Sequence, residues 1–290
     1  MASLIDGRAV AARLRETLAK EVAGFTGVRT PKLVAVIVGD RPDSATYVRM
    51  KTKACAEVGI ASEVLRLAHD VSQADLMSRV DGLSSDERVH GILVQLPLPP
   101  HIDERAVLER IDTSKDVDGF HAKHLGLLAM GHTDAIPVSC TPKGIMHLLD
   151  AYGVELAGKE VVVVGRSSIV GLPVSLLCMR RSATVTMCHS KTVDLQSHLK
   201  RADVVIAACG KPRFIKGEWL KEGAVIIDVG INSIDAPDTR LGYRLVGDVD
   251  FDEAVKVASM ITPVPGGVGP MTVACLLENL VEGYKRQIKD

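Results

Sequence analysis

Apolar and polar residues follow two rhythms along the first half of the chain, one typical of helices and one typical of buried strands. Val10, Leu14 and Leu18 recur every four residues behind Asp6, which predicts a helix over residues 6–22 with Asp6 as its cap. Continuous apolar runs predict strands over residues 32–38, 63–67 and 91–95. Helical spacing predicts helices over residues 43–58, 72–83 and 103–111.

The second half repeats a strand–helix pattern more regularly. Thr141-Pro142 opens a helix that carries Ile145, Leu148 and Leu149. Apolar runs predict strands over residues 160–164, 183–188, 203–208 and 224–229, with helices over residues 170–180 and 271–285. Strands that alternate with helices predict a parallel sheet covered on both faces.

The fold class predicted for the whole chain is α/β with two domains. A length of 290 residues fits two domains of about 100–200 residues each. The region over residues 131–142 contains two prolines and several polar residues, and we place the crossover there. The predicted N-terminal domain covers residues 1–138, and a Rossmann-type domain covers residues 139–270.

Composition and charge narrow the classes of function. Lys and Arg number 35 against 36 Asp and Glu, which argues against a nucleic-acid partner or a membrane-surface role. Aromatic residues make up 3%, so aliphatic side chains must fill the cores. The six cysteines form no Cys-x-x-Cys pair, so we expect reduced core thiols and no metal. The first residues do not resemble a signal peptide, so we expect a cytoplasmic protein.

One turn in the second half has the features of a phosphate-binding loop. Gly165 follows the apolar run 161–164 and allows a sharp turn, while Gly171 allows close packing of the next helix on the strand. The N–H groups at that helix start suit phosphate oxygens. A serine replaces the second glycine of the usual motif, and a simple strand-to-helix connection is the alternative.

The strand after this turn predicts the cofactor. An NAD site would carry Asp or Glu about 20 residues after the first glycine. Here the strand ends in Cys188-His189-Ser190-Lys191, without a carboxylate, and Arg166 lies in the turn itself. Arginine, hydroxyl and lysine donors suit the 2′-phosphate of NADP. The alternative is that Arg166 and Lys191 are solvated surface charges.

Polar residues in the first half supply candidate chemistry. Tyr47 and Lys51 lie four residues apart on a predicted helix and share one face. Gln95 follows an apolar strand, where parallel sheets bind ligands. Asp116 and Asp118 precede a glycine. Each has a plain alternative: a helix surface for the first pair, a satisfied amide for Gln95 and a solvated turn for the aspartates.

A glycine- and proline-rich run over residues 262–272 forms a stiff loop with bare backbone. Such a loop can lie flat against a planar ligand, and a rigid linker is the alternative.

Taken together, these stretches resemble the methylenetetrahydrofolate dehydrogenase/cyclohydrolase family over essentially the whole length. Ser139 stands where the family pattern has proline. The residues that carry the resemblance are Tyr47-Val-Arg-Met-Lys51-Thr-Lys53, Val94-Gln-Leu-Pro-Leu-Pro99, Lys115-Asp-Val-Asp-Gly119, Cys140-Thr-Pro-Lys-Gly144, Gly165-Arg-Ser-Ser-Ile-Val-Gly171 with Pro173, His189-Ser190, and Thr262 through Thr272.

The resemblance implies a bifunctional enzyme of one-carbon metabolism that also serves purine biosynthesis. It implies oxidation of 5,10-methylenetetrahydrofolate with NADP, then hydrolysis of the methenyl product to 10-formyltetrahydrofolate in a cleft shared by the domains. It also implies that the helix over residues 271–290 returns to the N-terminal domain. Family members are typically homodimers joined through the cofactor domain.

Site residues follow from the same resemblance. Lys51 is the expected acid/base catalyst, Gln95 orients it, Asp118 binds the pterin and Tyr47 frames the folate ring. The expected substrate-binding residues are Tyr47, Lys51, Gln95, Leu96, Asp118, Pro265, Gly266 and Gly267. The expected cofactor-binding residues are Thr141, Gly165, Arg166, Ser167, Ser168, Ile169, Gly171, Ser190, Cys209, Gly210, Gly230 and Ile231.

Two rival functions account for less of the sequence. A plain NAD(P)-dependent dehydrogenase would leave Tyr47, Lys51 and Gln95 without a role. A non-catalytic nucleotide-binding protein would be expected to lack at least one of Lys51, Gln95 and Asp118, and all three are present.

Overall fold

The structure, a computed structural model of the chain, describes residues 1–26, 29–132, 136–237, 239 and 242–288. The chain forms two compact units. The three-stranded unit consists of Ala12–Cys140 with Val273–Asp290, and the six-stranded unit consists of Met1–Ala11 with Thr141–Thr272. The first eleven residues, which the sequence assigned to the first domain, thus group with the six-stranded unit. Within the predicted crossover, residues 133–135 lie outside the described residues.

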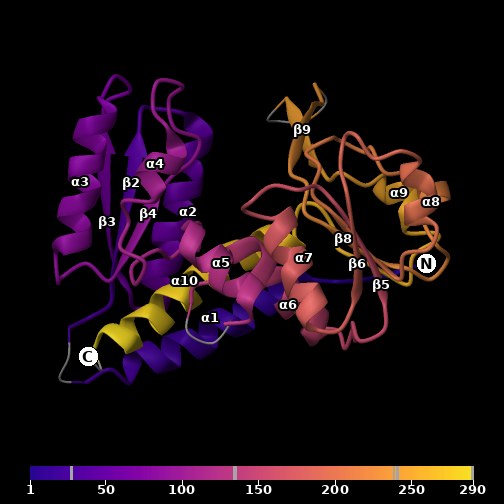
Figure 1. The fold of residues 1–290 in the computed structure, drawn as a ribbon, viewed down its shortest axis with the longest axis horizontal. Coiled ribbons are helices and arrows are strands. Elements are labelled where there is room, and N and C mark those ends of the chain that lie inside the picture. The colour runs from indigo at the N-terminus through magenta and orange to yellow at the C-terminus, as the bar shows by residue number, and fades with distance from the viewer. Residues whose placement is uncertain (27–28, 133–135, 238, 240–241, 289–290) are drawn as a thin grey trace. The chain divides into compact units, whose positions relative to one another are not determined.

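The three-stranded unit is built on a parallel sheet in the order β3-β2-β4. Helices α2 and α3 flank this sheet (Figure 1). Its strands are β2 (Lys32–Val38), β3 (Ala61–Leu67) and β4 (Gly91–Val94). Its helices are α1 (Gly7–Ala23), which starts in the other unit, α2 (Pro42–Val58), α3 (Gln73–Ser85), α4 (Glu104–Leu108), α5 (Ala122–Met130) and most of α10 (Val268–Gln287).

The predicted strands and helix ends of this unit are confirmed in their main features. Strand β2 has the predicted bounds, and six of its seven residues are buried. Asp6 caps α1 by accepting the N–H groups of Arg8 and Ala9. Gly59 ends α2 in the left-handed conformation, with φ 83°. These ends are local features, so the sequence alone predicts them.

Helix α5 was missed because its buried face carries no apolar repeat. Its buried residues are His124 and Leu128, four apart, and one of them is polar. An apolar-periodicity criterion cannot detect such a helix. Helix α4 is also shorter than predicted: Asp103 lies outside it as the cap, and the helix ends at Leu108, three residues before its predicted end.

The six-stranded unit contains a wholly parallel sheet in the order β1-β11-β8-β7-β5-β6. The strands are β1 (Ser3–Leu4), β5 (Glu160–Val164), β6 (Thr184–Cys188), β7 (Val204–Ala207), β8 (Val225–Asp228) and β11 (Met260–Ile261). The helices are α6 (Cys140–Ala151), α7 (Gly171–Arg180), α8 (Leu195–Leu199), α9 (Phe251–Ala254) and the short 3-10 helix η1 (Gly217–Trp219). An antiparallel hairpin of β9 (Asn232–Asp235) and β10 (Tyr243–Val246) stands away from this sheet (Figure 1).

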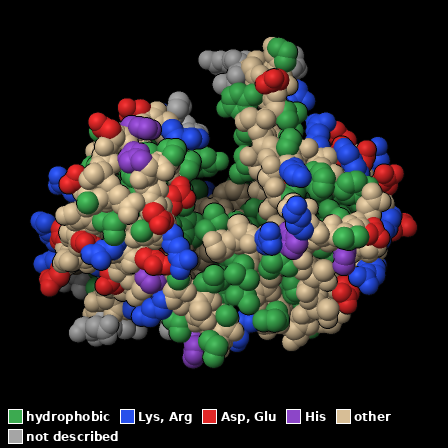
Figure 2. Space-filling view, turned by 45° about the horizontal axis from the view of Figure 1, so that its top comes forward, with side chains coloured by type: hydrophobic (Ala, Val, Ile, Leu, Met, Phe, Trp, Pro, Cys, Tyr) green, Lys and Arg blue, Asp and Glu red, His purple; other side chains and the backbone are tan. Residues whose placement is uncertain are grey.

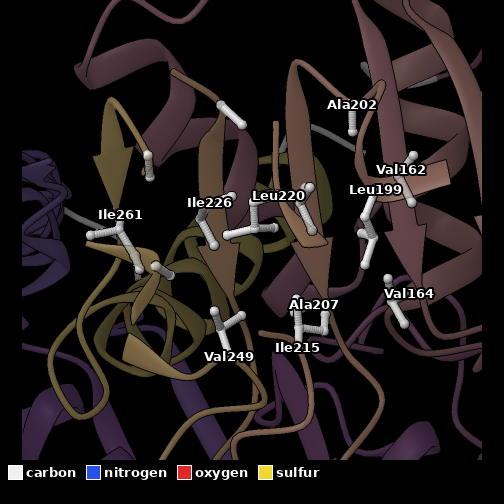
Figure 3. Packing of buried hydrophobic residues seen from close by; sticks show 14 of the residues in the cluster. Val162, Val164, Leu199, Ala202, Ala207, Ile215, Leu220, Ile226, Val249 and Ile261 are labelled. Carbon is white, nitrogen blue, oxygen red and sulfur yellow. The ribbon is translucent and has the colours of Figure 1, made fainter. Parts of the chain in front are cut away.

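Aliphatic side chains fill one face of the six-stranded sheet (Figure 3). Ile226 on β8 and Ile261 on β11 are fully buried, and Leu220 packs into the same cluster. Trp219, the only tryptophan of the chain, packs against this cluster. The predicted aliphatic core is confirmed here, and the tryptophan provides a spectroscopic probe of it.

The sequence missed the short elements of this unit, among them β1, β9 and β11, and it predicted too short a helix α10. The strand pair β1–β11 has two residues in each strand, and its partners are far apart in the chain. Strand β9 is polar and half-exposed, so it carries no apolar run. Helix α10 begins at Val268, three residues before its predicted start. Pro270 falls in its first turn, where a missing N–H costs no helical hydrogen bond.

The surface carries charges of both signs, and the thiols are mostly buried. On the face shown in Figure 2, acidic and basic side chains are mixed. All six cysteines are free, and Cys209 alone among them is partly exposed. None of the helices in the described part of the chain has both the length and the apolar character needed to cross a bilayer.

The cluster in Figure 3 generates a stability prediction for Ile226→Ala. The substitution should lower the free energy of unfolding of the six-stranded unit by about 2–5 kcal/mol, because it leaves a cavity in a close-packed core. Urea denaturation followed by Trp219 fluorescence measures this loss. Val193→Ala, at a side chain that is 85% exposed, is the control and should be neutral. Equal midpoints for the two variants would contradict the prediction.

Candidate active site

Lys51 and Gln95 meet inside the three-stranded unit. Lys51 lies on α2 and is buried, and its Nζ donates a hydrogen bond to Gln95 Oε1 at 3.3 Å. Gln95 directly follows β4, and its own Nε2 donates to the carbonyl oxygen of Leu96 at 2.8 Å. That second bond fixes the orientation of the amide, so its oxygen faces the lysine. Tyr47 lies one turn earlier on α2 and is 41% exposed.

The loop that carries Asp118 is held beside β4. Asp116 pairs with Ile92 of β4 in a parallel bridge, and the Ile92 N–H donates to the carbonyl of Lys115 at 2.8 Å. Two residues further along, the same register places Asp118 beside Val94, the last residue of β4. Gln95 is the next residue of the chain. The predicted residues Lys51, Gln95 and Asp118 are therefore brought together.

Asp116 shapes this loop from the inside. Its carboxylate accepts the N–H groups of Gly119 at 3.1 Å and His121 at 2.8 Å. Burial raises the pKa of Asp116 to about 7, and the nearby charge of Asp118 adds to the rise. The sequence named Asp116 only as part of a motif. Its role in folding the loop around Asp118 depends on hydrogen bonds that the residue pattern does not specify.

Asp118 differs from Asp116 in its partners. It is buried, yet none of the described residues donates a hydrogen bond to its carboxylate. Burial raises its pKa, and the positive charge of Lys51 acts in the opposite direction. The carboxylate is thus largely buried, has no N–H partner among the described residues and still reaches solvent, which makes it a candidate for binding a ligand.

The six-stranded unit has its own candidate site at the carboxyl end of β5. Strand β6 pairs with one side of β5 and strand β7 with the other, so the strand order reverses at this point. Open parallel sheets bind ligands at such a switch point, outside the carboxyl ends of the strands. The turn predicted to bind phosphate leaves β5 there.

Two glycines are needed to form this turn. Gly165 has φ 137°, a conformation that side chains rarely adopt. A Cβ on Gly171 would lie 2.3 Å from the Gly165 carbonyl oxygen. Ser167 Oγ accepts the N–H groups of Val170 and Gly171 at the start of α7. Arg166, Ser167, Ser168 and Ile169 are exposed along the turn.

The proposed phosphate donors lie at neighbouring strand ends. Val164 of β5 pairs with Cys188 of β6. Arg166 and Ser190 each come two residues after this pair, and both are exposed. Arg166 and Ser190 are far apart in sequence, and the parallel pairing of β5 with β6 brings them close together.

The remaining cofactor candidates follow the next two strands. Cys209 and Gly210 come after β7, and Gly230 and Ile231 come after β8. Strands β7 and β8 pair side by side, so both segments lie at the same edge of the sheet as the Gly165 turn. Sequence reasoning missed the two buried aspartates, Asp228 and Asp248, that hold these segments. The signal in the sequence was an aspartate, Asp228, within the predicted apolar strand over residues 224–229, and another directly after Gly247.

The glycine- and proline-rich run also belongs to the six-stranded unit. Thr262 is fully buried, and Pro265 is exposed. At its far end, Thr272 Oγ1 lies 3.0 Å from Oγ1 of Thr141. The predicted substrate residues Pro265, Gly266 and Gly267 therefore lie in a loop that leads directly into α10.

Comparison with known proteins identifies the family. Residues 5–118 match the catalytic domain of tetrahydrofolate dehydrogenase/cyclohydrolase, and residues 139–288 match its NAD(P)-binding domain. The chain belongs to this family. The family prediction from the sequence is thereby confirmed.

Individual relatives agree with the family match. Bifunctional protein FolD 2 of Arabidopsis thaliana is 56% identical over 287 residues, which cover 98% of this chain and 96% of that protein. Bifunctional protein FolD of Geotalea uraniireducens is 54% identical, with 99% and 100% covered. The structure of a Trypanosoma brucei methylenetetrahydrofolate dehydrogenase-cyclohydrolase with NADP and inhibitor has a TM-score of 0.95 at 46% identity, with 100% and 99% covered.

The predicted fold class and enzyme class are confirmed by the same matches. The chain is a two-domain α/β enzyme with a catalytic domain and an NAD(P)-binding domain of the tetrahydrofolate dehydrogenase/cyclohydrolase family. The matches do not test the roles of individual residues, so these stay predictions.

The raised pKa of Asp118 generates a prediction about stability and pH. Because the folded chain disfavours ionised Asp118, its contribution to stability is full below the unfolded pKa of about 3.9 and is lost as pH rises through its folded-state pKa. Asp118→Asn should therefore be more stable than wild type at pH 7 to 8, and this advantage should disappear near pH 4. Folate binding should weaken in the same variant.

Thermal unfolding across this pH range, with folate titration at pH 7.5, measures both effects. Asp70→Asn, at an exposed side chain, is the control and should change neither quantity. An Asp118→Asn variant that is less stable than wild type at neutral pH would overturn this account of Asp118.

Proposed function

We propose that the chain oxidises 5,10-methylenetetrahydrofolate with NADP and hydrolyses the 5,10-methenyltetrahydrofolate product to 10-formyltetrahydrofolate, with Lys51 transferring the protons. The observation that carries the residue assignment is the buried Asp118 carboxylate, which lacks a hydrogen-bond donor among the described residues and lies near Lys51. Such a carboxylate matches a ligand edge that presents two N–H donors, and the amino-pyrimidine edge of the pterin has this form.

The oxidation needs orientation more than proton transfer. A hydride leaves the methylene carbon, and the substrate becomes a methenyl cation. Asp118 holds the pterin edge, and the exposed ring of Tyr47 frames the folate ring system. Leu96 and the loop residues Pro265, Gly266 and Gly267 complete the substrate contacts that we assign.

The residues of the Gly165 turn fit NADP. The exposed turn between Gly165 and α7 lies where the pyrophosphate would bind, and the close approach at Gly171 keeps that turn tight. Ser167, Ser168 and Ile169 would line it, with Thr141 and the segments after β7 and β8 on the other side. When bound, NADP supplies the hydride acceptor. Arg166 and Ser190 would hold the 2′-phosphate.

The hydrolysis needs a group that moves protons. Water adds to the methenyl carbon, and Lys51, acting as the neutral amine, takes a proton from it. As the bond from this carbon to the ring nitrogen breaks, that nitrogen gains a proton, which Lys51 can return. The second proton of the water goes to solvent as the formyl C=O forms. Gln95 holds Lys51 through the 3.3 Å hydrogen bond and so fixes where the proton is taken.

We further assign the chain to a homodimer joined through the six-stranded unit, to the cytoplasm and to the supply of formyl groups for purine biosynthesis. These assignments rest on the family pattern in the sequence. Sedimentation equilibrium tests the first of them, and a mass equal to one chain of 31.0 kDa would reject it.

Lys51→Met should separate the two activities. Cyclohydrolase activity should fall by roughly a hundredfold or more, because the variant keeps side-chain volume but cannot accept a proton. NADP affinity should stay within about twofold, because Lys51 lies in the three-stranded unit. To measure both steps, the purified protein is incubated with methylenetetrahydrofolate and NADP, and the absorbances of NADPH and of the methenyl product are recorded together.

The matched control for Lys51 is Lys53→Met, which removes an exposed lysine from the same helix. It should behave as wild type in both steps. A Lys51→Met variant that still hydrolyses methenyltetrahydrofolate at the wild-type rate would show that Lys51 is not the proton-transfer group. A wild-type protein without NADPH formation would reject the proposed function itself.

Arg166→Ala should change the choice of cofactor. A guanidinium bonded to a phosphate contributes on the order of a tenfold preference or more, reduced here by solvent because Arg166 is exposed. The KM for NADP should rise sharply, and that for NAD should change little. Arg180→Ala, at the far end of α7, is the control. Steady-state kinetics with both cofactors decides, and equal efficiency of NAD and NADP in the wild-type enzyme would refute the assignment.

A further inference from the structure

A fully buried carboxylate holds the segment that follows β7. Asp248 Oδ2 accepts the N–H groups of Cys209 at 2.7 Å and Gly210 at 2.9 Å. Its Oδ1 accepts the N–H of Lys211 and the side-chain N–H of Asn232, both at 2.9 Å. Four donors thus converge on one side chain, so the carboxylate dictates the path of the backbone around it.

A second buried carboxylate fixes Asp248 in turn. Asp228, at the end of β8, accepts the N–H groups of Gly230 at 3.0 Å, Asp248 at 2.8 Å and Val249 at 2.9 Å. The N–H of Asp228 donates to Thr262 Oγ1 at 2.7 Å. The two aspartates therefore link the segments after β7 and β8 to the start of the glycine- and proline-rich loop.

Two glycines make room for these carboxylates. A Cβ on Gly230 would lie 2.3 Å from Asp248 Oδ1, and a Cβ on Gly247 would lie 1.8 Å from Asp228 Oδ2. Contacts this short would displace the carboxylates. The arrangement is therefore built into the sequence at four positions, which is more than a chance hydrogen bond requires.

Asp228 and Asp248 together form a clamp on the segments after β7 and β8. The place of this clamp in the sheet indicates which half of the cofactor it would affect. The strand order reverses between β5 and β7, so a dinucleotide bound at the Gly165 turn spans both sides of β5. Arg166 and Ser190 lie toward β6 and suit the 2′-phosphate of the adenosine half. The other half, which carries the nicotinamide, must then extend over the ends of β7 and β8. The segment from Cys209 to Lys211 lies at that place.

We propose that Asp248 is a positioning residue that fixes the backbone after β7 and β8 for the nicotinamide half of NADP, and that Asp228 holds Asp248 in register. This inference rests on the proposed function. It assigns Asp248 no contact with the cofactor and no proton transfer, because its four acceptor positions are occupied by protein donors.

Asp248→Asn tests the inference. The amide keeps the size of the side chain but replaces one acceptor oxygen by a donor, so at least one pair of N–H groups loses its partner. We expect the KM for NADP to rise by about tenfold or more. Binding of 2′,5′-adenosine bisphosphate, which carries only the adenosine half, should change by less than about twofold. Cyclohydrolase activity, measured without NADP, should also change by less than about twofold.

Two further variants keep the test decisive. Asp203→Asn, at the amino end of the same sheet, also loses an acceptor of a backbone N–H and should leave NADP kinetics unchanged. Asn232→Ala removes one of the four donors to Asp248 and should give a smaller rise in the KM for NADP. This second variant decides the question if Asp248→Asn does not fold, as judged by Trp219 fluorescence.

The outcomes separate the inference from the proposed function. Wild-type NADP kinetics in folded Asp248→Asn, or in Asn232→Ala where Asp248→Asn is unfolded, would overturn the inference. An equal loss of NADP, 2′,5′-adenosine bisphosphate and cyclohydrolase activity would also overturn it, because that pattern indicates general destabilisation. Failure of the wild-type enzyme to reduce NADP would instead reject the proposed function.

Discussion

Parallel strand pairing is the constraint on which both candidate sites depend. In the six-stranded unit, the pair Val164–Cys188 places Arg166 and Ser190 at neighbouring strand ends. In the three-stranded unit, the bridge between Ile92 and Asp116 places Asp118 beside the end of β4. Neither group of residues is contiguous in sequence. The common direction of the strands collects their following segments at one edge, where N–H groups and side chains can meet a ligand.

Buried aspartates then determine the shape of those segments. Asp116, Asp228 and Asp248 all accept backbone N–H groups from the loops around them. A loop at the end of a strand has N–H groups without sheet partners, and a buried carboxylate satisfies several of them at once. Burial raises the pKa of Asp228 to about 7, so this arrangement costs free energy when the carboxyl is ionised. The backbone N–H groups of Gly230, Asp248 and Val249 partly offset that cost by hydrogen bonding to the carboxylate.

The sequence predicted the parts of the fold and site that depend on local pattern. Strands β2 and β5 have their predicted bounds, because continuous apolar runs suit strands buried on both faces. The meeting of Lys51 and Gln95 was implied by the family resemblance, and the hydrogen bond between their side chains agrees with it. The predictions failed where partners are distant, as in the β1–β11 pair, or where a buried face is polar, as in α5. The contacts of Asp248 were missed for the first reason, since three of its four donors lie 37–39 residues away along the chain and the fourth lies 16 away.

The hydrogen-bond partners of the buried aspartates also separate structural groups from candidate reactive ones. Asp248 has four protein donors, which occupy its acceptor positions, and Asp228 has three, so protein N–H groups already satisfy most of the capacity of this pair. Asp118 is also buried, at 7% exposure against 4% for Asp228 and 0% for Asp248, but the described residues offer it only the charge of Lys51. A fold that satisfies every other carboxylate of this set gains nothing in stability from leaving one without donors. The exception is therefore best explained by a ligand that supplies the missing N–H groups, and the folate pterin presents two of them on one edge.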